Sequence, residues 1–165
     1  MSGRPAAQAR PALLATNYSA TDVVLLILRL ALAIVMFPHG AQKMLGWFGG
    51  PGFSGTIAFM TGSHIPAFLA FIVIIVEFFG PILLVLGLFT RLWALAIAID
   101  MIVAVMMVHL PNGFFMNWSG QQHGEGFEYH IYPIAIGIAL LIAGSGRFAL
   151  DNSFGRGDRA LDGPR

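Results

Sequence analysis

The sequence predicts an all-α integral membrane protein, a bundle of four transmembrane helices with its N- and C-termini in the cytoplasm. Three observations lead to this fold class: the composition, a set of long apolar segments, and the placement of the basic residues. Of the 165 residues, 57% are hydrophobic and only 10% are charged. A soluble domain of this length has too much surface to carry so few charges, whereas a bilayer solvates apolar side chains directly.

Four apolar segments reach or approach the length that a helix needs to cross a bilayer, roughly 20 residues. We expect helices at residues 23–45, 66–89, 92–110 and 127–144. Stretches rich in glycine and proline separate these segments and indicate loops. The chain is therefore interpreted as one transmembrane domain, 23–145, between a flexible N-terminal tail, 1–22, and a cytoplasmic C-terminal tail, 146–165.

The basic residues gather on one side of this arrangement. With both termini inside, every arginine falls in the inner half of the bundle or in a tail, and only Lys43 falls in the outer half. Positive charge is retained in the cytoplasm during insertion, so this bias predicts a multi-pass membrane protein with both termini inside. Under this topology all the histidines lie at or near the outer face. They are His39, His64, His109, His123 and His130.

The composition also excludes several functions. The chain has no cysteine, which excludes disulfides, thiol redox chemistry, thiolate-bound iron–sulfur clusters and covalent haem attachment. The net charge of +1 gives no basic excess for binding nucleic acid. No predicted helix carries histidines at a metal-ligand spacing, so no metal site is predicted. Any redox role therefore needs a bound cofactor or a partner protein.

Three charged residues, Arg29, Glu77 and Asp100, fall inside the predicted helices. Charged groups in a membrane are costly, so they normally face the bundle interior and pair with one another. From the inner ends of their helices, Arg29, Asp100 and Glu77 lie at depths of ~10, ~13 and ~16 Å, which allows a shared network. A structural ion pair of Arg29 with either acid, and a role of Glu77 or Asp100 in proton exchange, both remain open.

The stretch "FPHGAQKMLGWFGGPGF", residues 37–53, ends the first apolar segment. Pro38 cannot donate to the carbonyl group one turn earlier, so we expect a kink there. His39 and Lys43 are four residues apart and share a helix face. Together with polar residues that end the third segment and begin the fourth, they predict the rim of an outward-facing pocket. The candidate ligand-binding residues are Arg29, Phe37, His39, Lys43, Trp47, His109, Glu128, Tyr129 and His130.

The alternative to a ligand-binding pocket is that these groups only contact water and lipid headgroups at the membrane surface. The angular positions of the residues around each helix also limit which of them can line one pocket. Asp100 and His109 are nine residues apart, about 180° around an ideal helix, so they face one pocket only if the helix bends. Glu128 and His130 likewise lie on different sides of their helix, and at least one of each pair must do something else.

Several motifs resemble the DoxX family of small bacterial membrane proteins. They are "LILRLALAIVMFPHGAQKMLGWFGG", "EFFGPILLVLGLFTR", the Asp-bearing third segment and "GSGRFALD". The resemblance covers residues 22–151 and implies a four-helix membrane bundle with a loose association with quinone-linked redox systems. It also implies a multi-pass location in the bacterial plasma (inner) membrane. The residues that match recurring motif positions of the family are Arg29, His39, Gly40, Lys43, Glu77, Pro81, Arg91, Asp100, Gly146, Arg147 and Asp151. The resemblance does not say which chemical role they have.

The favoured hypothesis is a membrane component of a redox or oxidative-stress system that binds a quinone-like molecule in the outer half of the bundle. If it is catalytic, it is an accessory subunit of a quinone-linked oxidoreductase, with a partner redox protein or a homo-oligomer. Haem held by His39 with His109 or His130, or a metal, is the less favoured cofactor. The alternatives are an oligomeric transporter or channel subunit, with Arg29, Glu77 and Asp100 lining the path, and a non-catalytic anchor or assembly factor.

Overall fold

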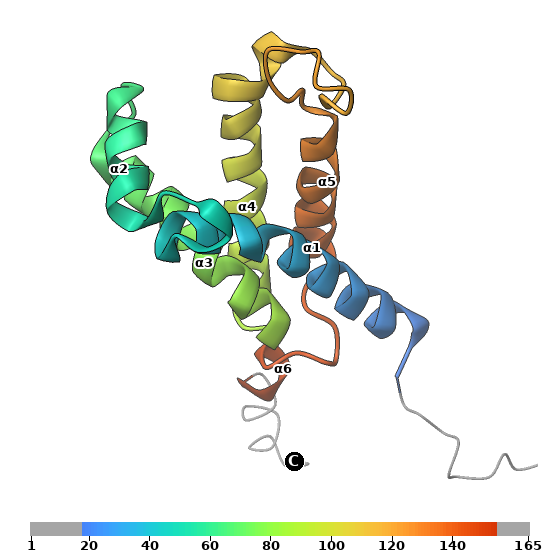
Figure 1. Ribbon diagram of the computed structural model, residues 1–165. Helices are drawn as coiled ribbons and strands as arrows, with labels where there is room; N and C mark the ends of the chain where they lie inside the picture. Colours follow the sequence, from blue (N-terminus) through green and yellow to red (C-terminus); the bar gives the residue numbers. More distant parts are fainter. Residues whose placement is uncertain (1–17, 155–165) are drawn as a thin grey trace, which may run out of the picture.

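The computed structural model describes residues 18–154, and within this range every regular element is a helix (Figure 1). The main helices are α1 (Ala20–Leu45), α2 (Gly52–Gly62), α3 (Ala67–Leu86), α4 (Thr90–Ala104), α5 (Glu128–Ala143) and α6 (Asp151–Phe154). A π-helical segment, η3 (Val105–His109), and a 3-10 turn, η4 (Leu110–Asn112), prolong α4, and a 3-10 turn, η2 (Trp47–Gly49), follows α1. The all-helical fold class is confirmed.

Within residues 18–154, three helical runs are long and apolar enough to cross a membrane: Ala20–Leu45, Ala67–Leu86 and Thr90–Asn112. They imply a lipid bilayer as the surroundings of this protein. The fourth predicted segment forms α5, which is apolar but has only 16 residues. At ~1.5 Å per residue it is ~24 Å long, somewhat less than the hydrocarbon core of a typical bilayer.

The bundle is built from two helix pairs. Helix α1 packs against α3, α4 packs against α5, and contacts between α3 and α4 join the pairs (Figure 1). We call the end at which α1 and η4 stop and α3 and α5 begin the loop end. The opposite end, where α3 stops, α4 begins and the described chain starts and finishes, is the terminal end. All the histidines belong to segments at the loop end.

Glycines allow the helices to touch at two crossings. A Cβ atom on Gly40 of α1 would overlap the backbone of Glu77 in α3. A Cβ atom on Gly137 of α5 would lie 2.8 Å from the carbonyl oxygen of Ala94 in α4. Small residues at such crossings allow close backbone approach in membrane helices. The fully buried core between the helices includes Leu32, Ile74, Leu84, Ile97 and Leu140.

The terminal end is more ordered than the sequence predicted. Helix α1 begins at Ala20 rather than residue 23, because Ser19 and Asp22 form a reciprocal capping box. Within the predicted C-terminal tail, residues 146–154 pack back onto the bundle. There the Asp151 carboxylate accepts hydrogen bonds from the backbone N–H groups of Phe89 (2.6 Å) and Thr90 (3.0 Å) and so caps α4. The rest of both predicted tails lies outside the described residues.

The loop predicted after the first helix contains an unpredicted helix, α2. Its three glycines favour a loop interpretation, yet α2 packs against both α1 and α3. The Thr56 side chain is buried and its hydroxyl group donates to the carbonyl oxygen of Lys43 (3.2 Å). Helix α2 is therefore tied to the last turn of α1, the turn that carries Lys43.

Candidate functional site

An ion pair joins the loop-end halves of α1 and α3. Lys43 Nζ lies 2.5 Å from Glu77 Oε2. The Glu77 side chain is 6% exposed and that of Lys43 is 25% exposed, so the carboxylate is buried and the amine reaches the edge of the protein. A buried carboxylate is costly unless it is paired, and Lys43 is its partner here. The pair forms because Gly40, one turn before Lys43, lets α1 touch α3 at Glu77.

Asp100 of α4 is the third charged member of this site. It interacts electrostatically with both Glu77 and Lys43. Its Oδ2 atom is buried and has no hydrogen-bond partner among the described residues. The site therefore places two carboxyl groups against one amine, in the part of the bundle where α1, α3 and α4 meet.

Imidazole and phenol groups complete the site. His39 interacts electrostatically with Lys43 and Glu77, and Tyr129 interacts with Glu77. His130 is buried and interacts with His39 and His109. The Tyr129 hydroxyl group and His130 Nδ1 are buried and unpartnered within residues 18–154. We call this set the polar cluster: His39, Lys43, Glu77, Asp100, His109, Tyr129 and His130.

A π-helical segment brings His109 into the polar cluster. The predicted difficulty was that Asp100 and His109 lie about 180° apart on an ideal helix. The structure has a π-helix at Val105–His109, whose hydrogen bonds span five residues instead of four, so His109 is rotated relative to an α-helical path. The His109 and His130 rings consequently lie 4.1 Å apart, centroid to centroid. Such π segments are frequent at functional sites.

Glu128 and His130 have different contacts, as predicted from their positions on different sides of the helix. The Oε1 atom of Glu128 accepts hydrogen bonds from the backbone N–H of Met116 (3.0 Å) and from Trp118 Nε1 (3.2 Å). Glu128 therefore holds the loop between η4 and α5. The same loop is bound to α4, since His109 Nδ1 lies 2.9 Å from the carbonyl oxygen of Glu125.

Arg29 does not join the acids, and the predicted pairing with Glu77 or Asp100 is wrong. Its guanidinium group is fully buried at the terminal end, where Nη1 donates to the carbonyl oxygen of Leu84 (3.1 Å) and Nη2 to that of Phe148 (2.8 Å). Positive charge is favourable there because α3 ends at this point, and the C-terminal end of a helix carries partial negative charge. Arg29 lies 14 residues before Lys43, ~21 Å along α1.

The two remaining candidates of the first segment have apolar surroundings. The Phe37 ring packs against Phe78, with centroids 5.8 Å apart, and lines an apolar groove of about 340 Å³ between α1 and α3. No residue of the polar cluster lines this groove. Trp47 is exposed and its ring contact is with Phe48.

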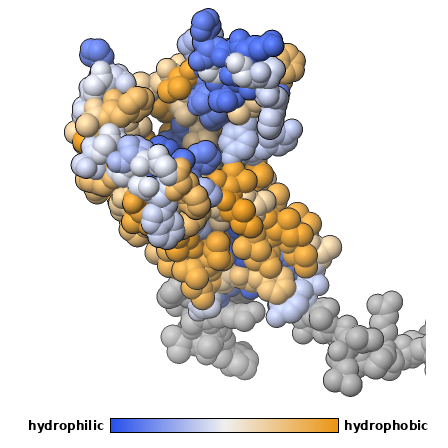
Figure 2. All heavy atoms as spheres, in the orientation of Figure 1, coloured by the Kyte–Doolittle hydropathy of each residue, from blue (hydrophilic) through white to orange (hydrophobic). Residues whose placement is uncertain are grey.

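Several members of the polar cluster reach the surface of the protein: His39 is exposed, and Lys43, Asp100, His109 and Tyr129 are partly exposed. Figure 2 shows hydrophilic residues between the part of the molecule that holds α2 and the part that holds α5 and the loop before it, above a largely apolar body. Over residues 18–154, no three side chains of His, Asp or Glu are arranged to hold one metal ion. The arrangement offers hydrogen-bond donors, a charge pair and a second carboxyl group to a small polar molecule.

These features define a small helical membrane protein with a polar cluster in one half of an apolar bundle. The family model of DoxX matches residues 24–110, more than half of the chain, and the protein belongs to the DoxX family.

Two relatives match nearly their whole length. A Bacillus subtilis (strain 168) protein named "Putative oxidoreductase CatD" is 31% identical over 130 residues, which cover 79% of this chain and 86% of the relative. The Escherichia coli (strain K12) protein named "Inner membrane protein YphA" is 32% identical over 138 residues, which cover 81% of this chain and 91% of the relative. No solved structure gives a significant match.

Proposed function

We propose that this protein is a membrane component of a redox or oxidative-stress system and that its polar cluster binds a quinone-like molecule. The observation that carries the proposal is the Lys43–Glu77 pair with Asp100 beside it, in a bundle that is otherwise apolar. Buried polar atoms normally have hydrogen-bond partners. Three unpartnered buried atoms, on Asp100, Tyr129 and His130, favour an additional molecule at this site.

The residues of the polar cluster suit a ligand with carbonyl or hydroxyl oxygens at opposite sides of a ring. Lys43, at the edge of the protein, is placed to donate to one such oxygen, and His39 or His130 to another. A bound quinone supplies the redox chemistry, because its reduction takes up two electrons and two protons. We assign the electrons to a partner redox protein and the exchange of protons to Asp100 and Glu77, since one amine balances only one of the two carboxylates.

The comparisons support this function in a general way. The name of the Bacillus relative is that of an oxidoreductase, and the name of the Escherichia relative places that protein in the inner membrane. We infer the same multi-pass location for this chain, with both termini in the cytoplasm. Arg91 and Arg147 at the terminal end support this orientation, which puts the polar cluster in the outer half of the membrane.

The proposed function is tested by what the purified protein carries. The protein is extracted in mild detergent, and bound small molecules are identified by mass spectrometry together with an absorption spectrum. We expect a quinone-like molecule in the wild type and about tenfold less in Lys43→Gln, since a hydrogen bond to a charged donor is worth about 1.5–3 kcal/mol.

Glu125→Gln is the matched control, because Glu125 is an exposed carboxylate of the loop-end region outside the polar cluster. It should retain the wild-type amount of the molecule. Equal amounts in the wild type and in Lys43→Gln, or no such molecule in either, would contradict the proposal. Proton flux in liposomes that Glu77→Gln abolishes would instead favour the transporter hypothesis.

A further inference from the structure

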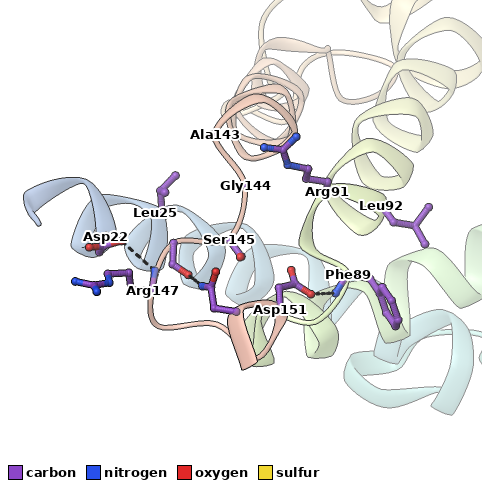
Figure 3. Close-up of a pocket in the computed structure, with 12 residues that line it drawn as sticks. Asp22, Leu25, Phe89, Arg91, Leu92, Ala143, Gly144, Ser145, Arg147 and Asp151 are labelled. Atoms are coloured by element: carbon purple, nitrogen blue, oxygen red, sulfur yellow. Dashed lines mark hydrogen bonds between the residues drawn. The ribbon is translucent and has the colours of Figure 1, made fainter. Parts of the chain in front are cut away.

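A second polar pocket lies at the terminal end, about one bundle length from the polar cluster. Its volume is about 710 Å³, and it lies between the first turns of α1 and α4, the end of α5 and the segment that leads to α6 (Figure 3). Four charged residues line it: Asp22, Arg91, Arg147 and Asp151. None of them belongs to the polar cluster.

The two carboxylates of this pocket are already engaged by hydrogen-bond donors of the protein. Asp22 Oδ1 accepts from the backbone N–H of Arg147 (3.0 Å), and Oδ2 accepts from the backbone N–H and the hydroxyl group of Ser19 (both 2.9 Å). Each oxygen of Asp151 accepts from a backbone N–H at the start of α4. Both acids therefore cap backbone groups and present little free acceptor capacity to a ligand.

Arg91 differs from the two acids in its unused hydrogen-bonding capacity. Its guanidinium group makes one hydrogen bond within the described chain, from Nη2 to the carbonyl oxygen of Ile142 (3.2 Å). Figure 3 shows the side chain extending from α4 toward the turn of Ala143 and Gly144 at the end of α5. A guanidinium group has five N–H donors, so Arg91 retains several for a bound anion. Two arginines balance the two carboxylates of the pocket, and Arg147 lies within electrostatic reach of Asp22.

Apolar groups stand next to these charges. Leu25 and Leu92 line the pocket, and Leu92 (60% exposed) and Ile142 (72% exposed) face outward beside it. The pocket lies where α4 begins and α5 ends, the level at which membrane helices leave the hydrocarbon core. A ligand that fits this position carries an anionic group for the arginine and hydrocarbon for the leucine and isoleucine.

We propose that this pocket binds the phosphate group of an anionic membrane phospholipid, with Arg91 as the principal ligand. Arginine binds phosphate oxygens through paired N–H donors, and arginines at the ends of transmembrane helices bind anionic lipid headgroups in this way. The acyl chains lie along the exposed faces of Leu92 and Ile142. The proposal is independent of what the polar cluster binds.

The test is native mass spectrometry of the full chain in detergent with added phosphatidylglycerol. We expect a retained lipid, with at least about tenfold weaker retention in Arg91→Gln, because charge-assisted hydrogen bonds are lost. Glu125→Gln changes an exposed charge at the other end of the bundle and should leave lipid retention at the wild-type level. Phosphatidylcholine, which has no net charge, should be retained more weakly than phosphatidylglycerol.

A second variant guards against a folding defect, because Arg91→Gln also removes the hydrogen bond to Ile142. Ala143→Phe keeps every charge and places a ring in the pocket, so it should weaken lipid retention as well. Wild-type retention in both variants would overturn the proposal. Inorganic phosphate is added as a competitor and should not displace the lipid, because it lacks acyl chains. Displacement at an equal concentration would overturn the lipid as the source of the phosphate.

Discussion

Gly40 of α1 lies directly against the backbone of Glu77 in α3, and this contact sets the distance between the two helices at the polar cluster. Lys43, one turn further along α1, then reaches the Glu77 carboxylate at 2.5 Å. Gly40, which has no side chain, thus sets the geometry of the Lys43–Glu77 pair.

Gly40→Ala should separate α1 from α3. The new Cβ atom would overlap backbone atoms of Glu77 and Phe78, which cannot rotate away as a side chain can. Overpacking of this kind typically costs about 1–3 kcal/mol, so the melting temperature in detergent should fall clearly. Gly62→Ala in α2 is the control, because a Cβ atom there meets nothing within 4 Å. Equal melting temperatures for the two variants would disprove the close contact.

Lys43→Met should destabilise the protein by leaving the Glu77 carboxylate buried without a partner. Removal of one member of a fully buried pair costs about 3–5 kcal/mol, and we expect the lower part of this range because Lys43 is 25% exposed. Adding Glu77→Gln to Lys43→Met should restore part of the stability, since the uncompensated charge is then gone. Thermal unfolding of the two single variants and the double variant measures the coupling. Additive effects would mean that the pair contributes no interaction energy.

Arg29→Met should destabilise the terminal end rather than the polar cluster. It removes the hydrogen bonds from the guanidinium group to the carbonyl oxygens of Leu84 and Phe148, and a hydrogen bond from a charged donor is worth about 1.5–3 kcal/mol. Arg29→Lys keeps the charge but not the planar fork, so its loss should be smaller than that of Arg29→Met yet measurable. Hydrogen exchange of the α3–α4 turn reports the site of the change. Faster exchange at the loop end alone would contradict this assignment.

Cysteines at positions 109 and 130 should cross-link. The chain has no cysteine of its own, so His109→Cys with His130→Cys gives a single defined pair. We expect a short bifunctional thiol reagent to link it, because the two rings lie 4.1 Å apart. Mass spectrometry detects the link, and His109→Cys with Glu128→Cys is the control, since Glu128 faces the loop. A control that links as well as the test pair would argue against the phase set by the π-helix.

The long transmembrane helices were predictable because a helix surrounded by lipid needs apolar side chains along its whole length. The predicted segments 66–89 and 92–110 correspond to α3 and to α4 with its extensions, each within three residues at either end. Helix α2 was not predictable in the same way. Its glycines at positions 52, 55 and 62 have low helix propensity, and its stability comes from packing on α1 and α3.

The residue types of the polar cluster were predictable, but the partners were not. Arg29, Glu77 and Asp100 have similar depths in the membrane, and depth alone favours Arg29 as the partner of the acids. The choice of Lys43 depends on the crossing point of α1 and α3, which Gly40 sets. The π-helix also left no signal, because "VMMVH" contains neither glycine nor proline. The hydrogen bonds of Asp151 to Phe89 and Thr90 join residues more than 60 positions apart, beyond the reach of local pattern.

The segment that follows α5 has a consequence for the order of assembly. Phe148 accepts a hydrogen bond from Arg29, and Asp151 supplies the acceptors for the first amides of α4. Both residues are synthesised after all the long helices. During translation the α3–α4 turn therefore lacks these hydrogen bonds until Phe148 and Asp151 leave the ribosome, and this end of the bundle is completed last. A chain that stops after α5 would insert its helices but would lack this closing step.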